Sequence, residues 1–194
     1  MPVKPPYSHS PLVPHVALPP WQSGRYYFVP NQSSVQTVST SGNGTVRAGP
    51  VVVPLNVTLV RIGAEVTSAG DAGSLVRLGI WQDDGTGRPG ALILDAGTIA
   101  GDSATVQEIT IAQPLTRGVY WFGLCVQNVT VTQPTLRFNA SSGLVPLDAG
   151  TSTPAANKAS LSVTRSGITG AFPATFGTAG LDPTPVPRIV VKVG

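Results

Sequence analysis

Short runs of alternating apolar and polar residues recur along most of this chain. A period of two places every second side chain on the same face of a β-strand, so a strand with one face against a core produces this pattern. The clearest apolar sets at this spacing are Val60, Ile62, Ala64 and Val66; Val76, Leu78 and Ile80; Tyr120, Phe122, Leu124 and Val126; and Ile189, Val191 and Val193. No long segment has apolar residues at helical spacing. The pattern therefore predicts strands throughout.

Turn signals divide the chain at intervals of about 8–12 residues, the spacing typical of a sandwich or barrel. The strands expected between them cover residues 25–29, 35–40, 51–67 with a break at Pro54, 75–82, 91–94, 97–100, 105–111, 118–127, 135–139, 161–164 and 188–193. We expect a turn at Asp95–Gly97, and one or two weak strands within the loop-rich residues 140–187. The predicted fold class is all-β, an antiparallel β-sandwich of the jelly-roll kind over residues 24–194.

Composition agrees with this fold class and argues against one class of partner. Charged residues make up only 11% of the chain, while Gly (22) and Pro (19), which destabilise helix interiors, are abundant. The net charge is +3, but no two Lys or Arg residues are adjacent. Because nucleic-acid-binding proteins concentrate basic residues in a patch or stripe, the scattered charge argues against a nucleic-acid partner.

Residues 1–23 are expected to form an extended arm that precedes the sandwich. Seven prolines fall within residues 1–20, a density that excludes helix and central strand and favours a polyproline-type backbone. A flexible linker is the alternative, but a linker needs no apolar anchors. The apolar anchors of the arm are Tyr7, Leu12, Val13, Val16, Leu18 and Trp21. They favour an arm that lies across a neighbouring subunit.

Nothing in the sequence indicates secretion or insertion in a membrane. The first residues contain no apolar signal-peptide core, and no stretch approaches the roughly 20 apolar residues of a membrane span. Five asparagines begin Asn-x-Ser/Thr sequons, which indicates either glycosylation or simply the density of Ser and Thr in strands and turns. Cys125 is the only cysteine, so no intrachain disulfide can form, and we expect it to be inert filling within a strand.

Two segments resemble a known module. Residues 76–98 read Val-Arg-Leu-Gly-Ile-Trp-Gln-Asp-Asp-Gly-Thr-Gly-Arg-Pro-Gly-Ala-Leu-Ile-Leu-Asp-Ala-Gly-Thr, and residues 115–124 read Leu-Thr-Arg-Gly-Val-Tyr-Trp-Phe-Gly-Leu. Together they resemble a β-sandwich module of minor tail and tail-fibre proteins of actinobacteriophages. The shared features are a strand ending in Gly-Ile-Trp, an Asp- and Gly-rich loop closed by Pro-Gly, a Leu-rich strand, an Asp-Ala-Gly turn and a later Gly-x-Tyr-Trp strand. The resemblance covers about residues 24–139.

This resemblance implies a place in the virion after synthesis in the host cytoplasm. It also implies homotrimers, contacts with other virion proteins and, in some members, binding to a glycan of the host surface. The chain departs from full tail fibres because it has no shaft, collagen-like repeat or coiled coil. A capsid decoration or head-fibre protein is therefore one alternative, and a carbohydrate-binding module is another.

The residues form no recognisable catalytic or cofactor-binding constellation. Gly85–Gly90 matches Gly-x-Gly-x-x-Gly, but a dinucleotide site also needs a helix at the last glycine, and a β-like run follows instead. Both histidines, His9 and His15, lie in the arm, where no rigid scaffold would hold a catalytic base. Asp83 and Asp84 are candidate Ca²⁺ ligands, with ordinary Asp-rich turn chemistry as the alternative. We expect neither enzyme activity nor a cofactor.

Trp81 and Trp121 each lie on the strand face opposite the apolar set of their strand. If these indoles are exposed, they could fill a subunit interface or stack on a sugar ring. If both faces of their sheet are covered, the indoles belong to a core instead. The sequence leaves these three interpretations open.

Overall fold

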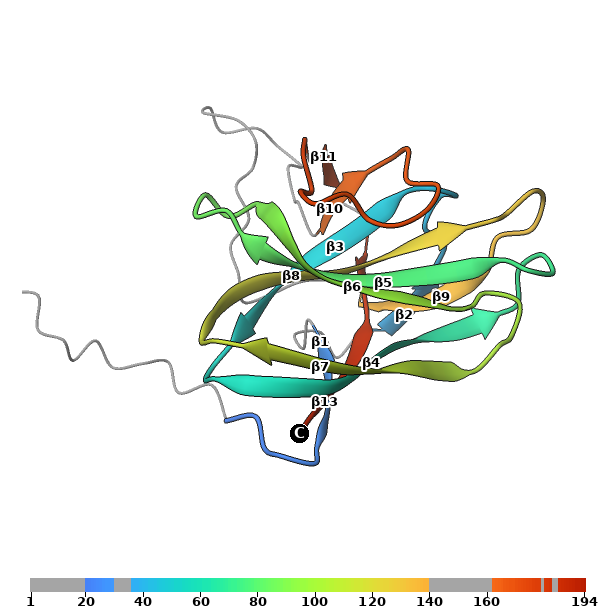
Figure 1. The fold of residues 1–194 in the computed structure, drawn as a ribbon. Coiled ribbons are helices and arrows are strands. Elements are labelled where there is room, and N and C mark those ends of the chain that lie inside the picture. Colours follow the sequence, from blue (N-terminus) through green and yellow to red (C-terminus); the bar gives the residue numbers. More distant parts are fainter. Residues whose placement is uncertain (1–19, 30–35, 140–161, 179, 183–184) are drawn as a thin grey trace, which may run out of the picture.

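The computed structural model describes residues 20–29, 36–139, 162–178, 180–182 and 185–194. The described chain contains thirteen strands and no helix, so no helix that could cross a membrane occurs in it. The strands form two antiparallel sheets that pack face to face, one above the other in Figure 1. The predicted all-β sandwich is therefore confirmed.

The lower sheet in Figure 1 has seven strands, in the order β1-β13-β4-β9-β12, with β2 paired to β9 and β7 paired to β4. Its strands are β1 (Tyr26–Val29), β2 (Gln36–Ser39), β4 (Val57–Ser68), β7 (Val106–Leu115), β9 (Thr135–Asn139), β12 (Val186–Pro187) and β13 (Ile189–Val193). The C-terminal strand β13 lies between β1 and β4, as expected of a terminal strand that returns to pair within the sheet.

The upper sheet has six strands, in the order β11-β10-β3-β8-β5-β6. Its strands are β3 (Val46–Val53), β5 (Leu75–Asp83), β6 (Pro89–Ala100), β8 (Gly118–Gln127), β10 (Ser162–Arg165) and β11 (Gly180–Asp182). The short strands β10, β11 and β12 lie in the loop-rich region of residues 140–187, where one or two were expected. Residues 140–161 of that region lie outside the described residues.

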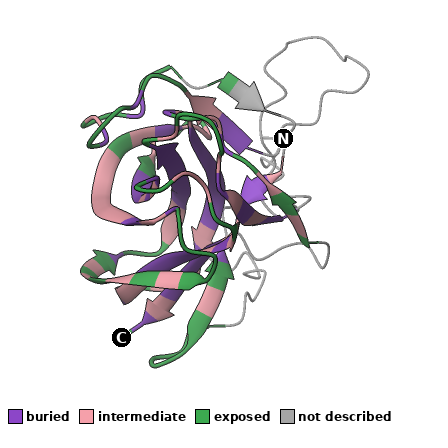
Figure 2. Ribbon diagram, turned by 90° about the vertical axis from the view of Figure 1, so that its right-hand side faces the viewer, coloured by how far each residue is buried: buried purple, intermediate pink, exposed green. Residues whose placement is uncertain are grey.

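The main core fills the space between the two sheets. It contains the apolar sets predicted on β5, β8 and β13, all of them buried. Figure 2 shows the buried residues along the strands of both sheets and the exposed ones mainly in loops and at strand ends. Because each fully buried Val, Leu, Ile or Phe contributes about 1.5–3 kcal/mol relative to exposure, this layer is the main source of stability.

An irregularity in β4 corrects one of the predicted apolar sets. The pairing register shifts between Leu59 and Arg61 with β7, and also at the contact with β13. Leu59 and Ile62 are therefore both fully buried although they lie three positions apart. Val60, which was predicted to point into the core, is only partly buried, and Leu59 takes its place.

Two strand boundaries also differ from the prediction. Residues 89–100 form one continuous strand, because Asp95–Gly97 is a β-bulge in the pairing with β5 and not a turn; Gly97 has a φ of 90°. Strand β3 begins at Val46, five residues early, although it contains Pro50. Among the described strands, β10 pairs only with residues 46–48 of β3, so β3 is an edge strand at Pro50, where proline is tolerated.

A second core covers the outer face of the six-stranded sheet. Residues 166–178, here called the strap, follow β10 and lie over this face (Figure 1, orange). Their side chains Phe172 and Phe176 meet the indole of Trp81 edge to face, at centroid distances of 4.9 and 5.3 Å. Trp121 is buried in the same cluster. Apolar side chains thus fill the space on both sides of this sheet.

Polar side chains at the edge of the second core hold the strap in place. The Asp95 carboxylate accepts the N–H of Phe172 at 2.9 Å and two hydrogen bonds from Arg77 at 2.8 and 3.0 Å. The amide of Gln127 donates to two strap carbonyls, at 3.3 and 2.8 Å. Main-chain hydrogen bonds join the strap to β6 as well. The strap is therefore a fixed layer of the fold although it is not a strand.

Shortening Phe176 tests the second core. Its side chain is 1% exposed, so Phe176→Ala should lower the free energy of unfolding by about 3–5 kcal/mol and shift the tryptophan emission to the red as water reaches Trp81. Val131→Ala is the control, because Val131 is 87% exposed, and it should cost about 1 kcal/mol or less. Urea denaturation followed by fluorescence measures both. Equal, small losses would show that the strap is not part of a core.

Candidate functional site

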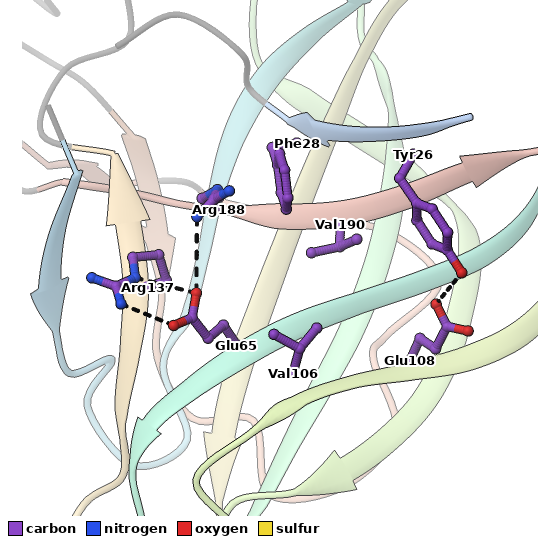
Figure 3. Close-up of a pocket in the computed structure, with 8 residues that line it drawn as sticks. All are labelled: Tyr26, Phe28, Glu65, Val106, Glu108, Arg137, Arg188 and Val190. Carbon is purple, nitrogen blue, oxygen red and sulfur yellow. Dashed lines mark hydrogen bonds and ion pairs between the residues drawn. The ribbon is translucent and has the colours of Figure 1, made fainter. Parts of the chain in front are cut away.

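The outer face of the seven-stranded sheet has a groove of about 610 Å³ (Figure 3). Its lining residues are Tyr26, Phe28, Glu65, Val106, Glu108, Arg137, Arg188 and Val190. We call it the outer groove. Strand pairing brings these residues together, because Phe28 lies opposite Val190 on β13 and Glu65 lies opposite Val106 on β7. Most of the lining residues are far apart in the sequence, so the groove exists only in the folded sheet.

The middle of the groove is apolar. Figure 3 shows Phe28, Val190 and Val106 between the charged side chains at its two ends. Gly63 lies opposite both Val190 and Glu108 in the strand register and adds no side chain to the floor. A Cβ at this position would come within 2.1 Å of the Gln107 carbonyl oxygen, so the close approach of β7 requires glycine here.

One end of the groove is an ion-pair network around Glu65. The carboxylate accepts two hydrogen bonds from Arg137, at 2.9 and 3.2 Å, and lies 3.8 Å from Arg188. The hydrogen bond with Arg137 lowers the pKa of Glu65 and raises the pKa of Arg137. Burial lowers the pKa of Arg188, whose guanidinium lies 3.6 Å from the centroid of the Phe28 ring. These contacts fix the side chains and keep Glu65 ionised.

The other end of the groove is held by a second network. The hydroxyl of Tyr26 donates to Glu108 at 2.9 Å, and Arg61 donates to the other oxygen of the same carboxylate at 3.1 Å. The hydrogen bond to Glu108 raises the pKa of Tyr26, so the phenol stays protonated. The ammonium of Lys192 lies 5.1 Å from the centroid of the Tyr26 ring. The polar atoms at both ends are thus already engaged within the chain.

Exposed apolar side chains concentrate on this sheet face. Five large apolar residues of the described chain are exposed, and four of them, Tyr26, Phe28, Val38 and Val106, are 43% to 58% exposed on the outer face of the seven-stranded sheet. Val38 belongs to this face because it lies opposite Arg137 in the strand register. Isolated exposed apolar residues are ordinary, whereas their clustering makes this sheet face a candidate interaction surface.

Trp81 and Trp121 are not available as a binding surface. The prediction that they lie opposite the main core is correct, but the strap covers them, and they are 1% and 0% exposed. Trp121 also donates its Nε1 hydrogen to Asp83 at 2.9 Å. Of the three interpretations, the one that places both indoles in a core is correct. The subunit-contact and glycan-stacking interpretations fail because a buried ring offers no face to a partner.

The candidate calcium ligands are occupied by their own loop. Besides the Trp121 hydrogen bond, Asp83 accepts the N–H of Gly85 at 2.8 Å. Asp84 accepts the N–H and the hydroxyl of Thr86, which lowers the pKa of its carboxyl. Among the residues that the structure describes, no three His, Cys, Asp or Glu side chains gather as metal ligands. The geometry is that of Asp-rich turn chemistry.

Of the predicted arm anchors, only Trp21 belongs to the described part of the chain. Its indole stacks on Tyr27 at 5.2 Å and packs against the main core. The N–H of Gln22 donates to the Tyr27 hydroxyl at 2.6 Å. Trp21 and Gln22 thus contact Tyr27 of their own chain. The other anchors, Tyr7, Leu12, Val13, Val16 and Leu18, lie outside the described residues, as do His9 and His15.

The remaining candidates for chemistry are structural. Gly85–Gly90 lies at the hairpin between β5 and β6, and β6 begins at Pro89, so the helix that a dinucleotide site needs is replaced by a strand. Cys125 is fully buried, and burial raises the pKa of its thiol to about 12, which makes it unreactive at neutral pH.

Comparison with known proteins adds no relative. No protein-family model matches this chain, and no curated protein is significantly similar to it. The resemblance to actinobacteriophage tail proteins therefore stays a prediction from the two segments quoted above.

The outer groove was not predicted from the sequence. Its residues are the outward-facing positions of strands whose core positions were recognised, such as Glu65 on β4 and Val190 on β13, together with the aromatic run of β1. An available signal was that aromatic residues and charges alternate with core positions on these strands. The strand order that places them side by side could not be read from the chain.

Replacing Glu65 tests the ion-pair network at its end of the groove. Glu65→Gln should lower the free energy of unfolding by about 1 kcal/mol at pH 7, because it breaks a bidentate contact with Arg137 that is partly screened by solvent. The pKa of Glu65 is lower in the folded chain, so this contribution is present above the ordinary value of 4.5 and is lost as the pH falls through the folded value.

The difference between variant and parent should therefore shrink as the pH falls below 4.5. Urea denaturation across this pH range measures it, and about 1 M salt at pH 7 should also reduce it. A difference that stays constant with pH would rule out an ionised Glu65 as its source.

Proposed function

We propose that this chain is a non-catalytic virion structural protein of a bacteriophage, of the minor-tail or tail-tip type, that assembles as a homo-oligomer through the outer groove. The clustering of exposed apolar side chains in this groove is the observation that carries the assembly role, because such clusters on soluble domains mark contacts with other proteins. The phage setting rests on the resemblance of residues 76–98 and 115–124 to actinobacteriophage tail modules.

The rigidity of the groove supports a role in assembly. Its lining side chains are carried by paired strands, and the side chains at both ends are held by hydrogen-bonded ion pairs. A surface whose side chains are already ordered loses little further conformational entropy when a partner binds. Little of the binding free energy would then be spent on ordering the groove.

The chemistry of the groove supports a non-catalytic role. A general acid needs a carboxyl group that holds its proton near neutral pH. The Arg137 hydrogen bond instead lowers the pKa of Glu65, so this carboxyl group releases its proton more readily than usual. Glu108 shares its two oxygens between Tyr26 and Arg61. Glu65 is therefore not poised to act as a general acid.

A capsid decoration or head-fibre protein would use the same surface with a different partner. The geometry of the groove suits a tail location and a capsid location equally, because it does not specify which virion protein lies next to it. The identity of the virion proteins that co-purify with the chain separates the two: tail proteins favour the tail-tip assignment, and the major capsid protein favours the decoration assignment.

A carbohydrate-binding module is the second candidate function. Half-exposed Tyr26 and Phe28, together with the charged side chains at the two ends of the groove, offer the aromatic and planar polar groups that sugars contact. The guanidinium of Arg188 lies over the Phe28 ring, and the ammonium of Lys192 lies over the Tyr26 ring. Binding on a glycan array that is lost in Phe28→Ala would favour this candidate over assembly.

The assembly role predicts that a charge in the groove separates the subunits. Val106 is 58% exposed, so Val106→Glu should leave the fold intact but introduce an unpaired carboxylate into the apolar floor. Light scattering after size exclusion should show an oligomer, expected to be a trimer, for the parent chain, and a monomer for the variant at the same concentration.

Val131→Glu is the matched control. Val131 is 87% exposed and lies on the loop between β8 and β9, away from the outer groove. This variant should keep the oligomer of the parent chain. A parent chain that is monomeric up to about 100 µM, well above the micromolar constants of ordinary transient complexes, would contradict the assembly role.

A further inference from the structure

The outer groove needs a convex, largely uncharged occupant. Its middle is apolar, and its four charged lining residues, Glu65, Glu108, Arg137 and Arg188, balance to zero net charge. The same groove on a second copy is also concave, so two grooves cannot fill each other. A strongly acidic or basic ligand would find no net opposite charge among the lining residues. A segment with apolar side chains and few charges fits best.

Residues 1–19 of this chain have that composition. They contain six prolines and the apolar residues Tyr7, Leu12, Val13, Val16 and Leu18, and Lys4 is their only charged side chain apart from the two titratable histidines. Grooves lined by aromatic side chains bind proline-rich segments because a polyproline helix is extended before binding and loses little entropy. Tyr26 and Phe28 supply such a lining, two positions apart on one strand.

The base of this segment is fixed at an edge of the sandwich. Trp21 and Gln22 contact Tyr27, whose ring packs against the main core, whereas the neighbouring Tyr26 and Phe28 line the outer groove on the other face of β1. β1 is the edge strand of its sheet. The chain therefore enters β1 from the core side, and residues 1–19 would have to turn around this edge to reach the groove of their own subunit.

The length of the segment suits a neighbouring subunit. At about 3.1 Å per residue, a polyproline helix of residues 1–19 spans roughly 59 Å. This reach exceeds the length of about 40 Å of the longest strands, β4 and β6, which have 12 residues each. An arm that leaves one sandwich at the edge of β1 can thus extend past it to the outer face of the next.

We propose that the proline-rich residues 1–19 of one subunit bind in the outer groove of a neighbouring subunit. The inference rests on the proposed function, and it names the partner of the groove as another copy of this chain. An arm that leaves one subunit and enters a different surface on the next makes a head-to-tail contact, and such contacts close into rings when the rotation permits. A homotrimer would be the smallest ring beyond a swapped dimer.

Two full-length variants test this contact. The arm variant Leu12→Glu/Val16→Glu keeps an intact groove, and the groove variant Val106→Glu keeps an intact arm. Each alone should associate at least about tenfold more weakly than the parent chain in sedimentation velocity experiments. Mixed in equal amounts, they should form a heterodimer, since the intact arm of one fits the intact groove of the other.

The matched control is Ser8→Glu/Ser10→Glu, which adds the same charge at polar positions of the arm and should associate as the parent does. Circular dichroism and tryptophan emission verify that each variant is folded. If the arm variant keeps its oligomer while the groove variant dissociates, the arm is not the occupant, but the proposed assembly role stands. If the two variants dissociate but do not complement each other, the arm does not bind this groove in a neighbour.

A monomeric parent chain overturns both proposals together. A second measurement then shows where the arm lies: limited proteolysis within residues 1–19 that becomes faster in Val106→Glu than in Val131→Glu places the arm in the groove of its own subunit. That result would replace the contact between subunits with a contact within one. Equal rates in the two variants would show that the groove holds no part of the arm.

Discussion

The six-stranded sheet is apolar on both faces, and this constraint determines how the rest of the molecule is arranged. On β5, Ile80 points into the main core while Trp81 points the other way, and on β8 Phe122 and Trp121 do the same. A sheet with two apolar faces has to be covered on both sides, because water on either side would cost the free energy of exposing large apolar side chains. The seven-stranded sheet covers one face and the strap covers the other.

The seven-stranded sheet has no second apolar face of this kind. Its outer side combines ion pairs at Glu65 and Glu108 with half-exposed Tyr26, Phe28 and Val106, and no described segment covers it as the strap covers the other sheet. The two outer faces of the sandwich therefore differ. Among the described residues, the strap closes one face, and the other face is left open.

Much of the strand pattern could be predicted from the chain, and the failures have local causes. β8 was predicted with its full bounds because ten alternating residues end at clear turn signals. The prediction that β6 is split at Asp95–Gly97 was wrong because a bulge and a turn use the same residue types, here Asp95 and a Gly97 with positive φ. The prediction missed the first residues of β3 because proline is allowed only where a strand is at an edge. Whether a strand is at an edge is a property of the whole sheet.

Sequence alone determined the fold class, because the period of two follows from the geometry of a single strand and needs no knowledge of its neighbours. It also determined which face of β5 and β8 carries Trp81 and Trp121. Only the tertiary structure decided that the strap buries these indoles, and that Phe28, Glu65, Val106 and Arg188 share one groove. Both outcomes depend on strand order and on contacts between residues far apart in the chain, which local periodicity does not encode.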